Sequence, residues 1–179
     1  MLLIAGVGYA HLRDLSFGMA LVERLETMEW PEDVRIEDFG YGPIAILHWF
    51  EETPGRRFDR AIFVGAMERD RAPGTLVTYD WIPRPLDPDD VQARICEAVT
   101  GVISLENLLI IAQHFDLLPR RTTVIEIEPP DKEFGLGLSP IGEERMTEVI
   151  AWLRHEVDTT ATGGHAGNGN GKHTEVSAR

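Results

Sequence analysis

The sequence predicts an α/β protein in which a mostly parallel sheet lies between layers of helices. Two short runs, 2–7 and 60–66, are almost continuously apolar, as inner parallel strands are. Longer segments with apolar residues three or four positions apart lie between the predicted strands, which is the pattern of helices that cover a sheet. This alternation, in a chain of 179 residues, favours a single domain.

Capping residues, prolines and glycines mark where the predicted elements of the first half begin and end. Ser16 is the expected cap of the first helix, and Trp30-Pro31 follows its end. Segment 33–38 alternates polar and apolar residues, which indicates a strand with one solvated side near the edge of the sheet. Pro43 suits the first turn of a short helix.

The second half predicts two strands and two helical regions. Segment 82–90 contains several prolines and is expected to be a loop, and the helical region after it divides near Thr100-Gly101. Ser139-Pro140 pairs a cap with a proline at the first helical position. The predicted elements are strand 2–7, helix 16–28, strand 33–38, helix 43–52, strand 60–66, strand 75–81, helices within 91–117, strand 122–127 and helix 139–157.

The composition changes after the last predicted helix. Segment 159–172 is rich in Gly, Thr and Asn and has no large apolar residue, so it cannot bury enough surface to offset its chain entropy. We therefore predict a folded domain at 1–157 and a disordered tail at 158–179.

The overall charge of the chain is −13, which argues against nucleic acid and against anionic membrane surfaces as partners. Cys96 is the only cysteine, so no disulfide forms within the chain and no thiolate cage can hold a metal. No apolar run approaches the length of about 18 residues that spans a bilayer, and no signal peptide precedes the first strand. We expect a cytoplasmic protein.

The loop after the first strand is the expected functional edge, because ligands gather at the carboxyl ends of parallel strands. Gly6-Val7-Gly8 begins like a dinucleotide-binding fingerprint, but His11 stands where the third glycine belongs. His11, Asp14 and Asp38 are the candidate catalytic or metal-binding side chains at this edge. Each also has a structural interpretation: Asp14 could cap the next helix, and Asp38 a turn with Gly40. The charged loop 68–71 is expected to be solvated.

Four short motifs stand in order along residues 1–157. They are Gly6-Val7-Gly8 with Asp14 and Gly18, Asp38-Phe39-Gly40, Ala72-Pro73-Gly74-Thr75 and Gly137-Leu138-Ser139-Pro140. In order and in spacing they resemble the motifs of the nickel–iron hydrogenase maturation endopeptidases. The resemblance implies a three-layer αβα sandwich around a twisted, mostly parallel, five-stranded sheet. It also implies a protein that acts on the hydrogenase large subunit, from which the family removes a C-terminal extension after nickel has been loaded.

The chain departs from this family at the three positions that contact the nickel region of the substrate. The acidic residue expected directly after the aspartate of the first loop is Leu15, and the aspartate expected at the end of the third strand is Gly65. The histidine expected ahead of the long helix aligns with Gly101, and Tyr9 replaces the usual asparagine. None of the three positions keeps a ligand atom in its side chain. We therefore expect no metal site and no cofactor in the protein itself, and nickel only as part of the substrate.

Three hypotheses follow from these residues. The first is a non-catalytic, monomeric relative that binds a hydrogenase large subunit, its C-terminal segment or another maturation factor. The second is an active endopeptidase in which Asp14, His11 and Asp38 supply coordination or acid–base chemistry. The third is an unrelated α/β protein that binds a small ligand. The residues of the predicted binding cleft are Gly6, Gly8, Tyr9, Asp14, Leu15, Asp38, Gly40, Gly65 and Gly101.

Overall fold

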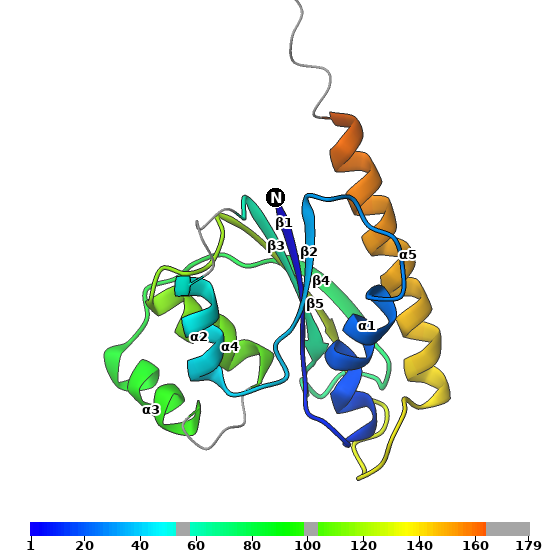
Figure 1. Ribbon diagram of the computed structural model, residues 1–179. Coiled ribbons are helices and arrows are strands. Elements are labelled where there is room, and N and C mark those ends of the chain that lie inside the picture. Colours follow the sequence, from blue (N-terminus) through cyan, green and yellow to red (C-terminus); the bar gives the residue numbers. More distant parts are fainter. Residues whose placement is uncertain (53–57, 99–103, 164–179) are drawn as a thin grey trace, which may run out of the picture.

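The computed structural model, which describes residues 1–52, 58–98 and 104–163, confirms the predicted sheet. Five strands lie in the order β2-β1-β3-β5-β4 (Figure 1). All neighbours are parallel except β4, which runs antiparallel to β5. The predicted position of β2 at an edge is confirmed. The strands are β1 (Leu2–Val7), β2 (Val34–Asp38), β3 (Arg60–Ala66), β4 (Leu76–Asp80) and β5 (Arg121–Ile127).

Helices cover both faces of the sheet and complete the three predicted layers. In Figure 1, α1 and α5 lie on one face, and α2, α3 and α4 lie on the other. The helices are α1 (Phe17–Leu25), α2 (Pro43–Glu52), α3 (Pro88–Ala98), α4 (Leu105–His114) and α5 (Pro140–Gly163), with a short 3-10 helix, η1, at Arg13–Ser16.

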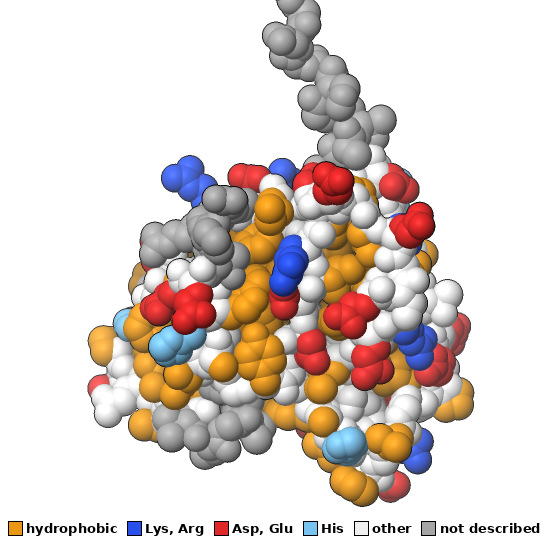
Figure 2. All heavy atoms as spheres, viewed as in Figure 1, with side chains coloured by type: hydrophobic (Ala, Val, Ile, Leu, Met, Phe, Trp, Pro, Cys, Tyr) orange, Lys and Arg blue, Asp and Glu red, His pale blue; other side chains and the backbone are white. Residues whose placement is uncertain are grey.

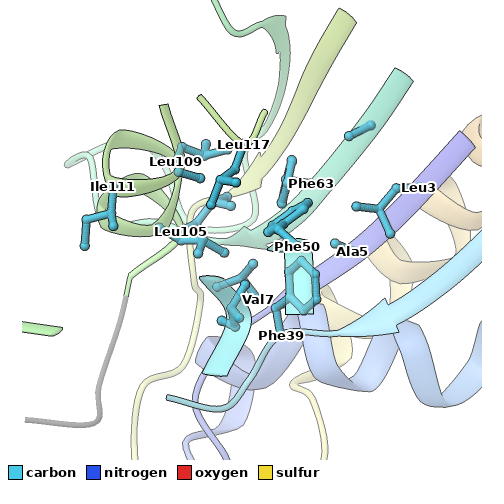
Figure 3. Packing of buried hydrophobic residues seen from close by; sticks show 14 of the residues in the cluster. Leu3, Ala5, Val7, Phe39, Phe50, Phe63, Leu105, Leu109, Ile111 and Leu117 are labelled. Atoms are coloured by element: carbon cyan, nitrogen blue, oxygen red, sulfur yellow. The ribbon is translucent and has the colours of Figure 1, made fainter. Parts of the chain in front are cut away.

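Successive side chains along a strand point to opposite faces of the sheet, and they contribute to a separate apolar core on each face. On β1, Leu3 packs toward α2 and α4, whereas Ile4 packs toward α1 and α5. The core beside α2 and α4 centres on Phe39, which is fully buried directly after β2 (Figure 3). Its ring lies 5.5 Å from that of Phe50 and 6.4 Å from that of Phe63, centroid to centroid. Aromatic pairs at such separations add to the stabilisation that burial gives.

Glycine at two motif positions lets the start of α1 lie directly on the sheet. A Cβ atom added to Gly18 would lie 2.3 Å from the carbonyl oxygen of Val7 and 2.6 Å from that of Val64. A Cβ atom added to Gly6 would lie 2.0 Å from the carbonyl oxygen of Gly18. No side chain fits at these distances, so backbone contact between α1, β1 and β3 requires both glycines.

The first helix is shorter than predicted, and Ser16 does not cap it. The α-helical part begins at Phe17, after η1, and ends at Leu25 instead of Met28. The Ser16 hydroxyl turns away from the helix: it donates to the carbonyl of Tyr9 at 2.6 Å and accepts from the backbone N–H of Leu12. Local side-chain hydrogen bonds of this kind compete with capping.

Two other helix boundaries differ from the prediction. Helix α3 begins at Pro88, inside the segment expected to be a loop, and the carboxylate of Asp87 accepts from the N–H of Asp89 at this end. Helix α5 continues to Gly163, so residues 158–163 are helical and not part of a disordered tail. There the Thr159 hydroxyl donates to the carbonyl of His155, which keeps it within the helix. The rest of the predicted tail, and the predicted junction at Thr100-Gly101, lie outside the described residues.

The surface reflects the acidic composition. On the face drawn in Figure 2, acidic side chains are spread widely, whereas the basic side chains of the described residues lie apart from one another. In the part of the chain that the structure describes, no helix is both long and apolar enough to cross a bilayer.

The aromatic core predicts a large effect of truncation at Phe39. Replacement of Phe39 by Ala removes a fully buried ring and leaves a cavity, so we expect the free energy of unfolding to fall by about 3–5 kcal/mol. Phe134→Ala is the matched control, because the Phe134 side chain is 84% exposed. Chemical denaturation followed by circular dichroism measures both, and equal stability of the two variants would contradict this packing.

Candidate functional site

The candidate site lies where the parallel strands end, at the loop between β1 and α1. The backbone at this edge includes three glycines of the predicted cleft, Gly6, Gly8 and Gly65. A Cβ atom on Gly8 would lie 2.7 Å from the carbonyl oxygen of Leu15, so the loop folds back on the end of its own strand. The N–H of Tyr9 donates to that same carbonyl at 3.1 Å. The loop is therefore a compact turn, closed by its own backbone.

Asp14 is buried beneath the start of α5. It is 0% exposed, and its two carboxylate oxygens accept from the backbone N–H groups of Asp131 and Ser139, each at 2.9 Å. The N–H of Asp14 donates in turn to the carbonyl of Asp131 at 3.0 Å. The positive end of the α5 dipole lies beside this carboxylate, because Ser139 caps the helix through a bond from the N–H of Gly142 to its hydroxyl.

This arrangement gives Asp14 a structural role. The predicted structural role of Asp14, a cap on the next helix α1, is wrong. Its carboxylate instead holds the start of the last helix, α5. Gly142 leaves the space for it: a Cβ atom there would lie 2.1 Å from Oδ1 of Asp14. With both oxygens occupied and no exposed surface, the carboxylate cannot reach a substrate in this conformation.

His11 lies on the surface of the same loop. It adopts a left-handed backbone conformation, with φ of 65°, and its side chain is exposed. Its ring centroid lies 6.4 Å from that of Phe134, and its carbonyl accepts from the N–H of Gly135 at 2.9 Å. The loop after β1 and the segment before α5 are thus joined by backbone as well as by Asp14.

Asp38 ends β2 and forms the predicted turn with Gly40. Its Oδ1 atom accepts from the N–H of Gly40 at 2.7 Å, so this structural interpretation is confirmed. Tyr41 follows on the surface, 38% exposed. Burial raises the pKa of its hydroxyl, and the carboxylates of Glu37 and Asp38 raise it further. The end of β2 therefore presents an aromatic ring among negative charges.

The structure does not join the three candidate catalytic side chains. No hydrogen bond in the described residues connects any two of His11, Asp14 and Asp38. Across the same part of the chain, no group of three His, Cys, Asp or Glu side chains is placed to hold a metal ion.

The described ligand positions do not fit a metal. Leu15 is partly buried and packs against the core beside α1 and α5. A Cβ atom on Gly65 would lie 2.7 Å from the carbonyl oxygen of Val7 and 3.3 Å from Cδ2 of Leu105. The space beside Gly65 is thus filled by backbone and by the first residue of α4, and it holds no donor side chain. Gly101 lies outside the described residues.

A buried glutamate on β5 forms a charged cluster at the same edge of the sheet. Glu126 is 1% exposed and is the register partner of Gly65 on the neighbouring strand. It accepts hydrogen bonds from the Tyr79 hydroxyl at 2.7 Å, from Arg71 at 2.9 Å and from Arg69 at 3.2 Å. Buried charges require such partners.

The hydrogen bonds keep Glu126 charged. Burial raises the pKa of its carboxyl, but the bonds from Tyr79, Arg69 and Arg71 outweigh burial, so the pKa lies below its ordinary value. The pKa of the Tyr79 hydroxyl lies above its ordinary value, since burial and the bond to Glu126 both raise it. The cluster is therefore an ion network at neutral pH, in which Nη1 of Arg71 is buried without a hydrogen-bond partner.

Sequence reasoning missed this network. The loop 68–71 was expected to be solvated, which is wrong for its two arginines. Besides Glu126, Arg69 contacts Glu106 of α4, and its backbone N–H donates to Glu128 at 2.8 Å. The available signal was an acidic residue among the apolar residues that end a predicted strand, together with arginines two positions apart in the charged loop. The network connects the end of β3 to β5 and α4.

No protein-family model matches this sequence, and no curated protein matches it. Solved structures do. The chain is similar to the hydrogenase 2 maturation peptidase of a Thaumarchaeota archaeon, with 25% identity, a TM-score of 0.59, and coverage of 87% of this chain and 96% of that one. It is also similar to the hydrogenase maturating endopeptidase HybD from E. coli, with 25% identity, a TM-score of 0.60, and coverage of 87% and 93%.

A more distant structure shares the fold. The NiFe hydrogenase maturation protease HycI from Thermococcus kodakarensis is 20% identical, with a TM-score of 0.54 and coverage of 87% of this chain and 90% of that one. These similarities extend over most of both chains. They favour the predicted family over an unrelated ligand-binding protein.

The contacts of Asp14 predict a stability effect that an exposed aspartate would not have. In Asp14→Asn one oxygen becomes an amide donor facing a backbone N–H, and we expect a loss of about 2–3 kcal/mol in unfolding free energy. Asp33→Asn is the control, because Asp33 is exposed ahead of β2. Urea unfolding of both variants measures the difference. A neutral Asp14→Asn would contradict a structural role for this carboxylate.

The Glu126 network predicts a pH dependence. Because the folded pKa lies below the ordinary value of 4.5, charged Glu126 contributes full stability above that value and loses it as the pH falls through the folded pKa. We expect Glu126→Gln to cost about 3 kcal/mol at pH 7 and less at acidic pH, since it removes a buried anion from two partly buried arginines. Denaturation curves between about pH 3 and pH 7 test this.

Glu133→Gln serves as the control for this measurement, because Glu133 is exposed. Its stability is expected to follow the wild-type curve at every pH. A cost of Glu126→Gln that stayed constant down to the lowest pH would contradict the network.

Proposed function

Since this chain is a structural relative of the hydrogenase maturation peptidases, we propose that it binds a nickel–iron hydrogenase large subunit, or the C-terminal segment of that subunit, without cleaving it. The observation that carries the proposal is the contrast at the carboxyl edge of the sheet. The scaffold that shapes this edge is kept, whereas the side chains that would hold a metal there are replaced.

The kept part is geometric. Gly6 and Gly18 let α1 contact the strands by backbone, and Asp14 holds the start of α5 against the loop. These residues shape the edge and do not themselves offer chemistry. A protein that kept them would still present the surface onto which a hydrogenase precursor fits.

The replaced part is chemical. Leu15 packs into the apolar core, and Leu105 closes the space beside Gly65. Aliphatic carbon coordinates no divalent ion, and neither His11 nor Asp38 joins Asp14 to form another ligand set. These contacts support binding over hydrolysis, because removal of a C-terminal extension requires a group that activates water or polarises a carbonyl.

Binding without cleavage suits a factor that retains the precursor until another protein completes it. We propose that the monomeric chain meets the precursor in the cytoplasm and that nickel enters only as part of that partner. The accessible rim of the site includes Tyr41, whose ring is a suitable anchor for a peptide segment.

The proposal is tested by mixing the full chain with the unprocessed large subunit from the same organism. We expect the two to co-elute in size-exclusion chromatography while the mass of the precursor, measured by mass spectrometry, stays unchanged. A loss of mass would show an active endopeptidase, and failure to co-elute would exclude the precursor as partner.

A pair of aromatic truncations locates the interface. Tyr41→Ala, at the proposed rim, is expected to weaken capture of the precursor by about tenfold, since interface aromatics of this kind often dominate binding energy. Phe115→Ala is the matched control, because Phe115 is an aromatic residue that is 46% exposed and lies away from the site. It follows the end of α4, and it is the beginning of α4 that lies at the site. Equal effects of the two changes would contradict a binding site at the carboxyl edge.

A further inference from the structure

A second concave site lies at the opposite edge of the sheet. Its volume is about 470 Å³, and it is enclosed by the beginnings of β3 and β5, the end of β4 and the second half of α5. Pockets that hold small ligands usually measure about 300–1,000 Å³. The carboxyl edge of the sheet, where the candidate functional site lies, is a full strand length away.

Arginines dominate the charge of this pocket. Arg60, Arg120 and Arg121 line it, in a chain whose net charge is −13. Arg60 is neutralised by an ion pair with Glu156 of α5. Neither Arg120 nor Arg121 forms an ion pair or a side-chain hydrogen bond with any of the described residues, and both are exposed. Arg120 and Arg121 thus line the pocket with no ion pair to an anion of the described chain.

Most basic side chains of the described residues form ion pairs with carboxylates, whereas exposed Arg84, outside the pocket, does not. Arg24, Arg35 and Lys132 all pair with carboxylates, although each is as exposed as a surface residue normally is. With 30 acidic residues against 17 basic ones, carboxylates are abundant. Arg120 and Arg121 differ from Arg84 in that they line the same cavity, where both are available to an external anion, since Arg matches phosphate and carboxylate geometry.

The remaining lining gives the pocket further recognition groups. Trp81 and Trp152 contribute indole rings, which pack against planar groups and sugar faces. The Trp81 ring is held in place, because its Nε1 donates to Gln113 at 3.0 Å. Asp80 accepts from the Thr123 hydroxyl at 3.1 Å through Oδ1, and its carboxylate is an acceptor suited to ligand hydroxyl or amino groups.

From this combination we propose that the pocket binds a phosphorylated small molecule that carries hydroxyl groups, of the nucleotide or sugar-phosphate class. The phosphate lies against Arg120 and Arg121, Asp80 accepts from hydroxyl groups, and a tryptophan ring covers one side of the ligand. The site is independent of precursor binding, because the two lie at opposite ends of the strands.

Calorimetric titration of the full chain tests the proposal with three probes: AMP, ribose 5-phosphate and inorganic phosphate. We expect saturable binding of AMP, of ribose 5-phosphate or of both. Tighter binding of AMP identifies the nucleotide class, and equal binding identifies the sugar phosphate as the recognised part. Absence of saturable binding for both, or equally tight binding of inorganic phosphate, would overturn the proposal.

Charge-removing variants decide whether the pocket is responsible. Arg120→Gln and Arg121→Gln are each expected to weaken binding by about tenfold, because each removes a charge-assisted hydrogen bond to the phosphate. Arg84→Gln makes the same change at an exposed arginine outside the pocket and should leave affinity unchanged. Thermal melting verifies that all variants fold. An unchanged affinity in both pocket variants, or an equal loss in Arg84→Gln, would contradict the site.

Discussion

The carboxylate of Asp14 is the interaction on which the functional edge of this protein depends. It connects segments more than a hundred residues apart, because it accepts from the N–H groups of Asp131 and Ser139. A buried carboxylate is costly unless its oxygens are bonded, and here two backbone donors and the start of α5 stabilise it. The loop after β1, the segment before α5 and the helix itself are held together as one unit.

Backbone packing shapes the carboxyl edge. The close contacts at Gly18 and at Gly65 are made by backbone atoms and by Leu105, so no polar side chain lies between the strands and the helices there. On β5, Glu126 is held by two arginines of the loop after β3. Those ion pairs connect the ends of β3 and β5. The proposal that the chain holds a precursor without cleaving it rests on this arrangement.

The two ends of the sheet have different electrostatic character. At the carboxyl edge Glu126 is paired with two arginines, and Tyr41 lies among carboxylates. At the amino edge, Arg120 and Arg121 lie beside a cavity and find no partner in the described chain. Arg84 is also exposed and unpaired, so the position of Arg120 and Arg121 beside the cavity is what distinguishes this end of the sheet. The two proposed sites lie at opposite ends of the strands.

The sequence by itself determined the order of the elements and the architecture. Apolar runs and their spacing predicted β1, β3 and α2 at or within a residue of their bounds, since burial imposes that periodicity along the chain. It also predicted the turn of Asp38 with Gly40, because the partners are two residues apart. The same patterns predicted five strands, and the family resemblance implied the three-layer sandwich and the expected departures at the ligand positions.

Only the tertiary structure decided the partners of the polar residues. Asp14 has the sequence context of a local cap, yet it binds backbone groups near α5. Arg69 has the sequence context of a solvated loop residue, yet it binds Glu126 of β5. Ser16 could have capped α1, and instead it closes the loop before it. Periodicity reports which side of an element is buried, whereas a long-range hydrogen bond depends on how two distant segments pack. That packing is fixed by the whole core, and no local pattern contains it.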